Sequence, residues 1–251
     1  MGRITLDSIS HPERNSLVKI RNSVALVTGA NRGLGRAIAL ELVARGAKVY
    51  AGVRNVDVEL PEGLTPIKLD VTSAEDVAAA VAAAGDVTIL VNNAGIGRRM
   101  GFLEPGTIDT TRELFETNFY GPVRMSQAFA PILAKNGGGA IVNVLSVASW
   151  VTPPVIAAYA ASKSAAWGFT NALRLQLRDQ GTQVLALHVG YMDTDMTAGL
   201  DIAKVSPAQV AALTVDGIEA GAEEVLADEV TRAVKRALSD EAGVYLSVPQ
   251  L

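Results

Sequence analysis

The sequence predicts a single α/β domain of the doubly wound, Rossmann-like type, with helices on both faces of a parallel sheet. From residue 23 onward, short apolar runs alternate with longer segments of helical periodicity. A glycine-rich segment follows the first apolar run directly, and no repeat or linker divides residues 23–251. Parallel strands need helical crossovers, so this alternation favours a parallel sheet. We expect the polar residues 1–22 to form an N-terminal arm outside this domain.

The expected elements follow from apolar runs and their periodicity. Strands are expected at residues 23–28, 47–53, 65–71, 86–91, 140–146 and 182–189. The helix after the first strand ends at Gly46, and further helices are expected at residues 73–84, 109–134, 156–179 and 223–238. In the last of these, Leu226, Val230, Val234 and Leu238 would line one face. Residues 196–208 are expected to be rich in loops.

Composition excludes several classes of function. The 251 residues are 49% hydrophobic and 19% charged, with a net charge of −4, which is typical of a soluble globular protein and not of a nucleic-acid binder. The absence of cysteine excludes disulfides, thiol nucleophiles and cysteine-ligated metals. Residues 1–22 lack the apolar core of a signal peptide, and glycines and prolines interrupt the uncharged run 136–162, so we expect no membrane span and a cytoplasmic location.

The segment TGANRGLGR, residues 28–36, leads from the first strand into a helix. Gly29, Gly33 and Gly35 would supply a tight turn and a close approach of the backbone to a pyrophosphate, which the N–H groups of the helix would bind. Their spacing is GxxxGxG and not the GxGxxG of the Rossmann fingerprint. A glycine-rich turn without a nucleotide is the alternative, and the position after the first strand favours the nucleotide.

Several motifs together resemble the short-chain dehydrogenase/reductase family. TGANRGLG is similar to the family's TGxxxGxG motif, and NNAG at 92–95 is similar to the next one. Asn118, Ser146, Tyr159 and Lys163 then follow in the family's order, and the resemblance extends to about residue 197. It implies a nicotinamide-dependent oxidoreductase that acts on a small carbonyl or alcohol. It also implies a homodimer or homotetramer that pairs through helices 109–134 and 156–179.

The pair Tyr159 and Lys163, four residues apart in YAASK, would lie on one helical face. Tyr159 could exchange a proton with the carbonyl oxygen if the Lys163 ammonium and an oxidised nicotinamide lowered its pKa. Ser146 would hydrogen-bond the same oxygen. The resemblance implies that Lys163 also holds the nicotinamide ribose and that Asn118 holds a water leading to solvent. Each residue also has a purely structural explanation, but the four together favour catalysis.

The cofactor is expected to be NADP(H). An NAD site usually carries an acid about 20 residues beyond the glycine turn, bonded to the ribose. Residues 49–54 contain no acid and end in Arg54, and Arg32 lies within the glycine turn. Two guanidinium groups suit a 2′-phosphate, whereas the alternative is that both arginines are solvated surface charges.

The remaining cofactor contacts are implied by the resemblance. They are Asn31, Leu34, Asp70, Val71, Asn92, Ala94, Gly95, Gly190, Met192 and Thr194, in addition to Tyr159 and Lys163. Asp70 would meet the adenine and Asn92 would line the cleft, the alternatives being a strand-end cap and a turn residue. After the sixth strand the family usually has Pro-Gly, where this chain has Val189 and Gly190.

An apolar substrate wall is expected around the site. It would consist of Val147, Trp150, Val155, Met192, Met196 and Leu200. Arg98 and Arg99 could bind an anionic group, although solvated charges are the better explanation. His188 is expected to be a hydrogen-bonded core residue, and Asp193 with Asp195 would form a metal site only with a further ligand.

Two alternative functions remain open. One is a catalytically idle NADP-binding sensor or scaffold of the same fold, because a fold alone does not imply catalysis. The intact set of four candidate catalytic residues argues against it. The other is a nucleotide-sugar epimerase of related fold, which would need a longer C-terminal substrate region.

Overall fold

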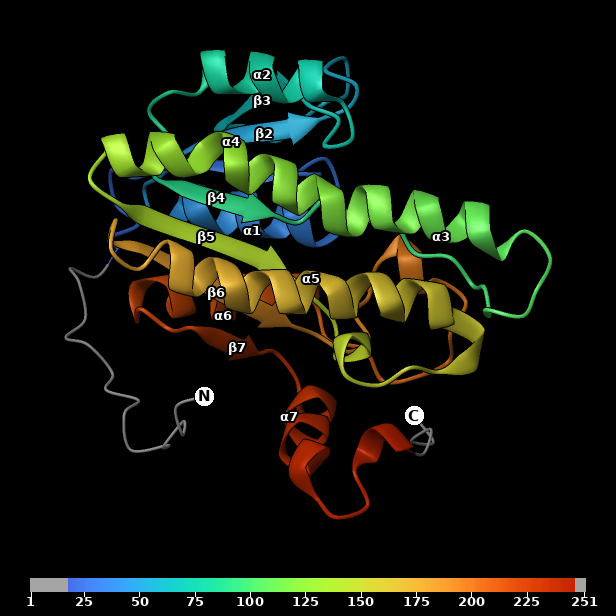
Figure 1. Cartoon of the computed structure of the whole chain (residues 1–251). Coiled ribbons are helices and arrows are strands. Elements are labelled where there is room, and N and C mark those ends of the chain that lie inside the picture. The colour runs from blue at the N-terminus through green and yellow to red at the C-terminus, as the bar shows by residue number, and fades with distance from the viewer. Residues whose placement is uncertain (1–17, 247–251) are drawn as a thin grey trace, which may run out of the picture.

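The computed structural model describes residues 18–246, in which all strands belong to one parallel sheet (Figure 1). The strands are β1 (Val24–Thr28), β2 (Lys48–Val53), β3 (Leu64–Lys68), β4 (Ile89–Asn92), β5 (Gly139–Val144), β6 (Thr182–His188) and β7 (Glu224–Leu226). Their order is β3-β2-β1-β4-β5-β6-β7, and each neighbouring pair is parallel.

Helices cover both faces of the sheet, which confirms the predicted doubly wound fold (Figure 1). The longer helices are α1 (Gly33–Ala44), α2 (Ala74–Ala83), α3 (Thr107–Phe115), α4 (Gly121–Lys135), α5 (Ala157–Gln176), α6 (Pro207–Glu219) and α7 (Glu229–Arg236). Ile38 of α1 and Val215 of α6 pack on one face. Phe129 of α4 and Leu173 of α5 pack on the other.

The central strands are buried on both sides, and their side chains alternate between the two cores. In β1, Val27 points into the α1 and α6 core, whereas Leu26 points into the α2, α4 and α5 core. In β4, Val91 points into the α1 and α6 core and Leu90 points into the α2, α4 and α5 core. This period of two explains why the central strands read as continuous apolar runs.

The C-terminal part differs from the prediction. The expected helix 223–238 is wrong at its start, because Glu224–Leu226 form strand β7, which pairs with β6. Helix α7 begins only after Asp228, whose carboxylate accepts the N–H of Thr231 at 2.8 Å and caps the helix. Leu226 has helical spacing to the later apolar residues because the strand and the helix both pack against one apolar cluster. Val230 lies outside this cluster and is 38% exposed.

Helix α6 was missed by the sequence analysis. It starts at Pro207, and Ser206 and Gln209 form a capping box at its N-terminus. Serine at the cap, proline at the first helical position and glutamine at the third are a recognisable start signal. The expected loop at 196–208 therefore ends where this helix begins.

Residues 1–17 of the expected N-terminal arm lie outside the described residues. Of the remainder, Ile20 is fully buried against the α1 and α6 core. The Ser23 hydroxyl donates to the Ile20 carbonyl at 2.7 Å. Residues 18–22 therefore pack onto the domain. Between residues 18 and 246, no helix is long and apolar enough to cross a membrane.

The sheet topology places a crevice between β1 and β4. These strands are neighbours, but the chain leaves β1 toward β2 and leaves β4 toward β5, so their following segments diverge to opposite faces. Ligands of open α/β sheets bind beyond the carboxyl ends of strands at such a switch point. The glycine-rich turn follows β1 and the NNAG segment follows β4, so both border this crevice.

Gly35→Ala is predicted to destabilise the domain. A Cβ at this position of α1 would lie 2.3 Å from the Gly29 carbonyl oxygen and 2.3 Å from Nδ2 of Asn93. Overpacking of this kind costs about 1–3 kcal/mol of unfolding free energy, which urea denaturation measures. Gly168→Ala in α5 is the matched control, because no described atom lies within 4 Å of its Cβ. It should stabilise by about 0.5–1 kcal/mol, and equal effects of the two would contradict the prediction.

Candidate active site

The glycine-rich turn leaves the start of α1 open to an anion. Gly29 and Gly33 have φ values of +66° and +55°, a region that glycine enters without the cost of a Cβ. Arg32 occupies the N-cap and makes no side-chain hydrogen bond to the helix, and the first turn contains no acid. The N–H groups at this end are therefore available to a phosphate, so the cradle fits a dinucleotide. Asn31 is exposed on the turn, and Leu34 is buried beneath it.

Thr28 and Asn93 connect the turn after β1 to the segment after β4. The Thr28 hydroxyl oxygen accepts the N–H groups of Asn93 and Ala94 at 3.0 and 2.9 Å. The Asn93 amide in turn donates to the Thr28 carbonyl at 2.8 Å. Sequence analysis named Ala94 and Gly95 but missed these two residues. The doubled asparagine of NNAG and the threonine before Gly29 were the available signals.

Asn92 lies in a buried polar row and not on the open crevice. It is 4% exposed, and its Nδ2 donates to Asn143 Oδ1 at 2.8 Å and to Ser126 Oγ at 3.2 Å. Asn143 continues the row to the Thr170 hydroxyl at 2.9 Å. The row joins β4 and β5 to α4 and α5. Asn92 Oδ1 has no hydrogen-bond partner among residues 18–246.

Ser146 and Tyr159 lie together at the carboxyl end of the sheet. Ser146 follows β5, and its Oγ accepts the N–H of Ala148 at 3.1 Å, which leaves the hydroxyl proton free to donate. Tyr159 lies in the first turn of α5, close enough to the Ser146 side chain for it to influence the pKa of the phenol. Lys163 lies one turn further along, with Nζ 5.9 Å from the centre of the Tyr159 ring.

Burial changes the proton affinities of both groups. It raises the pKa of Tyr159 above its ordinary value, although the Ser146 side chain opposes this. It lowers the pKa of Lys163 to about 8. The Lys163 ammonium donates to the Val144 carbonyl at 3.0 Å. At neutral pH, Tyr159 is therefore protonated and able to donate.

Asn118 lies in η2 (Glu116–Tyr120), a π-helical turn between α3 and α4. Its side chain accepts the N–H of Ile96 at 2.9 Å and donates to the Ile96 carbonyl at 3.0 Å and to the Ser162 hydroxyl at 3.0 Å. The side chain thus fixes the segment after β4 to α5. Such π-helical turns occur often at functional sites. The expected helix 109–134 is α3, η2 and α4 in succession.

A narrow cavity brings Asn118 and Lys163 to one place. Its lining includes Asn92, Ala94, Asn118, Asn143, Val144 and Lys163. A Cβ on Gly95 would lie 3.2 Å from Asn118 Oδ1 and 3.7 Å from Lys163 Nζ. Gly95 therefore leaves room beside the lysine that a larger residue would fill.

The segment after β6 is held at its start by Asp228. The N–H of Gly190 donates to Asp228 Oδ2 at 2.6 Å, while Oδ1 caps α7. Sequence analysis missed Asp228, whose position directly before a helix was the only signal. Val189, which replaces the usual proline, is buried. The hydrogen bond to Asp228 thus supplies a restraint on the loop.

The other predicted cofactor residues lie on the segments after β2, β3 and β6. Arg54 is exposed at the end of β2, and Asp70 accepts the Thr72 N–H at 2.9 Å as a strand-end cap. Val71 is buried, and its carbonyl accepts from Arg124 at 2.6 Å. The backbones of Met192 and Val205 form an isolated β-bridge. Thr194 lies over Gly33, because its Cγ2 would be 3.5 Å from a Cβ built on Gly33.

Arg32 and Asp195 pair across the crevice. Nη1 of Arg32 lies 2.9 Å from Oδ2 of Asp195, and both side chains are exposed. Within the described part of the chain, no group of three or more His, Asp or Glu could hold a metal ion. Arg98, considered for an anionic substrate, pairs with Glu113 at 2.6 Å.

The expected substrate wall is wrong in part. Val147 and Trp150 pack with Val234 of α7 in a separate buried cluster. Trp150 stacks on His188 with ring centres 3.9 Å apart, so it faces the interior. The error arises because nearness to Ser146 in sequence does not fix the side on which a side chain lies. Val155, Met196 and Leu200 are exposed, as a substrate wall requires.

His188 is a core residue, as expected, but it is only partly hydrogen-bonded. Nδ1 lies 3.3 Å from the Ser146 carbonyl oxygen, whereas Nε2 has no hydrogen bond to any residue in 18–246 and lies 3.6 Å from Oε1 of Glu224. Burial lowers the pKa of His188 to about 3, so the ring is neutral at physiological pH.

The chain is similar to known proteins over most of its length. Residues 23–204 match the short chain dehydrogenase family. It is 35% identical to the 3-oxoacyl-[acyl-carrier-protein] reductase FabG of Salmonella typhimurium, over 90% of this chain and 93% of that protein. It is 34% identical to the rat dehydrogenase/reductase SDR family member 7B, over 81% of this chain but only 64% of the length of that relative.

Solved structures show the same architecture. A short chain dehydrogenase from Burkholderia cenocepacia in complex with NADP has a TM-score of 0.85 at 35% identity, covering 89% of this chain and 95% of that one. A 3-ketoacyl-(acyl-carrier-protein) reductase from Brucella melitensis complexed with NADH has a TM-score of 0.73 at 28% identity, covering 81% and 93%. This chain belongs to the short-chain dehydrogenase/reductase family.

Proposed function

We propose that the chain is an oxidoreductase that transfers a hydride between NADP(H) and an apolar carbonyl or alcohol, with Tyr159 as general acid and base. The observation that carries this proposal is the pair of Ser146 and Tyr159, close enough for Ser146 to influence the Tyr159 pKa, with Lys163 one helical turn away and its Nζ 5.9 Å from the centre of the Tyr159 ring. The pair lies at the same edge of the sheet as the open start of α1. Membership of the family supports the same class of reaction.

The nicotinamide would supply or accept the hydride, and the chain would handle the proton and the charge. In carbonyl reduction, Tyr159 donates its proton to the carbonyl oxygen, for which its raised pKa keeps it protonated. The Ser146 hydroxyl, with its oxygen held by the Ala148 N–H, donates to the same oxygen and stabilises the developing negative charge. Alcohol oxidation requires Tyr159 as the base, so the phenolate must then be stabilised by a nearby positive charge.

Lys163 is proposed to supply part of that charge and to hold the nicotinamide ribose. Its bond to the Val144 carbonyl keeps the ammonium behind Tyr159, in the cavity that Asn118 also lines. Asn118 is proposed to hold a water that connects Lys163 to solvent. Its two amide hydrogens already donate to the Ile96 carbonyl and the Ser162 hydroxyl.

NADP(H) is the proposed cofactor because of the charges near the adenosine end of the crevice. Arg54 follows β2 directly, no acid precedes it in that strand, and Arg32 lies on the glycine turn. A guanidinium group matches a phosphate by paired charge-assisted hydrogen bonds. The Burkholderia relative was solved with NADP, although the Brucella relative was solved with NADH. The two arginines therefore carry this part of the proposal.

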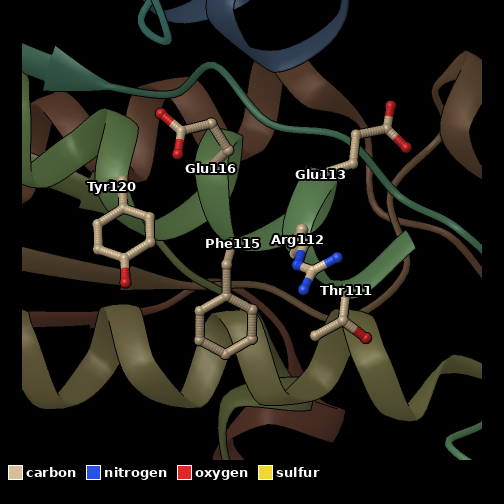
Figure 2. A pocket seen from close by; sticks show the side chains of 6 residues that line it. All are labelled: Thr111, Arg112, Glu113, Phe115, Glu116 and Tyr120. Carbon is tan, nitrogen blue, oxygen red and sulfur yellow. The ribbon is translucent and has the colours of Figure 1, made fainter. Parts of the chain in front are cut away.

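A homodimer or homotetramer is proposed to form through the face of α3, η2, α4 and α5. An open hollow of about 610 Å³ lies on this side, lined by Thr111, Arg112, Glu113, Phe115, Glu116 and Tyr120 (Figure 2). Tyr120 is 49% exposed, and Leu175 of α5 is 63% exposed. Apolar and aromatic groups exposed on neighbouring helices are typical of a protein interface. None of the four candidate catalytic residues lines this hollow.

Tyr159→Phe is predicted to abolish catalysis but not cofactor binding. Loss of a general acid lowers kcat by about 100-fold or more, whereas the phenyl ring keeps its packing. A panel of carbonyl compounds, followed by NADPH absorbance, gives turnover, and calorimetry gives the NADPH affinity. Tyr120→Phe is the control, because this tyrosine is exposed and outside the catalytic set. Retained turnover in Tyr159→Phe would contradict the assigned acid, and NADPH binding without turnover of any compound by the unaltered chain would favour an idle sensor.

NADPH affinity is predicted to fall as pH rises through about 8. The cofactor-free chain loses the Lys163 proton there, since burial lowers its pKa to about 8. The proposed contact to the ribose then weakens, because an amine donates a weaker hydrogen bond than an ammonium. Stability changes with pH in the opposite direction from NADPH affinity. Because the pKa of Lys163 is lower in the folded chain than in the unfolded chain, the free energy of unfolding rises between pH 8 and the ordinary lysine pKa. Calorimetric titrations between pH 7 and about 9.5 measure the affinity, and a constant value would contradict the role of Lys163.

A further inference from the structure

One ion pair joins the two sides of the cofactor crevice. Arg32 lies on the glycine turn at the N-cap of α1, and Asp195 lies on the segment after β6 at the start of η5 (Asp195–Thr197). Their side chains meet at 2.9 Å, although they are 163 residues apart in the chain. The side chains are 69% and 76% exposed, so both can turn toward another partner.

The backbone around Asp195 holds the carboxylate opposite the turn. The N–H of Thr197 donates to the Thr194 carbonyl at 3.0 Å, and the Thr197 hydroxyl donates to the Met192 carbonyl. Behind them, the N–H of Asp193 donates to the Val205 carbonyl at 3.0 Å. A Cβ on Gly33 would lie 3.5 Å from Cγ2 of Thr194, so this segment lies over the glycine turn. The position of Asp195 is thus set by a folded turn.

We propose that Asp195 competes with the cofactor's 2′-phosphate for Arg32, and thereby sets how strongly the chain prefers NADP(H) over NAD(H). The inference rests on the proposed function, in which Arg32 and Arg54 receive that phosphate. Asp195 occupies Nη1 of Arg32, one of the donors that a phosphate would use in a paired contact with the guanidinium group. Before the phosphate can use this donor, the bond to Asp195 must break. NAD(H) has no such group, so its binding leaves the ion pair intact.

The expected size of the effect is modest. An exposed ion pair stabilises little, because water screens it and two long side chains lose freedom when they pair. Releasing Arg32 should therefore tighten NADP(H) binding by about two- to fivefold. Arg54, which makes no ion pair with any residue in 18–246, should be unaffected.

Asp195→Asn tests the proposal by calorimetric titration with NADPH, NADH and adenosine 2′,5′-bisphosphate. The variant should bind both 2′-phosphate ligands about two- to fivefold more tightly and NADH with unchanged affinity. Asp193→Asn is the matched control, because it removes the same charge two residues away from Asp195. Asp193 is exposed and makes no ion pair in the described structure. In an Arg32→Ala background, Asp195→Asn should have no effect on any of the three ligands.

The outcomes separate this inference from the proposed function. A preference of the unaltered chain for NADPH that Asp195→Asn does not increase would overturn the inference alone. An equal gain from Asp193→Asn and Asp195→Asn would also overturn it, since the effect would then be one of general charge. Equal affinities for NADPH and NADH in both the unaltered chain and Asp195→Asn would overturn the inference and the NADP preference together. A preference that emerges only in Asp195→Asn would support the inference and refute the NADP preference of the natural chain.

Discussion

The hydrogen bonds of the Thr28 hydroxyl are the interaction on which the candidate site depends. A parallel sheet delivers strand ends to one edge but does not fix the loops that follow them. Thr28 accepts two main-chain N–H groups from the segment after β4, so the two loops become one wall. Gly35 then lets α1 approach this wall closely, where any side chain would collide with Gly29. The open start of α1 thus faces the crevice in a fixed position.

The second constraint is the burial of Tyr159 and Lys163, which penalises the charged form of each. The same environment raises the proton affinity of the phenol and lowers that of the ammonium. Tyr159 therefore keeps its proton at neutral pH, whereas Lys163 begins to lose its proton near pH 8. Asn118 and Ser162 hold the surrounding loop and helix in register. The polar row from Asn92 to Thr170 joins the strands beneath.

The fold was predictable because its signals are local. Apolar runs and glycine turns gave six of the strands in their correct regions and the doubly wound class. The motifs also named Ser146, Tyr159 and Lys163, which lie near one another beyond β5 and in α5. Long-range features were not predictable: Trp150 turns to α7, Asp228 reaches Gly190, and Asp195 reaches Arg32. The short strand β7 was missed because its three residues fit a helical pattern as well. Partners that are distant in sequence leave no periodicity from which to infer them.

The central claim is that hydride transfer takes place where these strand ends meet. The most direct measurement follows a deuterium label from the reactive carbon of NADPH into the product. The chain is incubated with labelled NADPH and a panel of apolar aldehydes and ketones, and the alcohols are examined by mass spectrometry. The account predicts that deuterium appears on the carbinol carbon of at least one alcohol and that Tyr159→Phe forms none. NADPH bound at the site without labelled alcohol from any compound, or labelled alcohol formed equally by Tyr159→Phe, would contradict it.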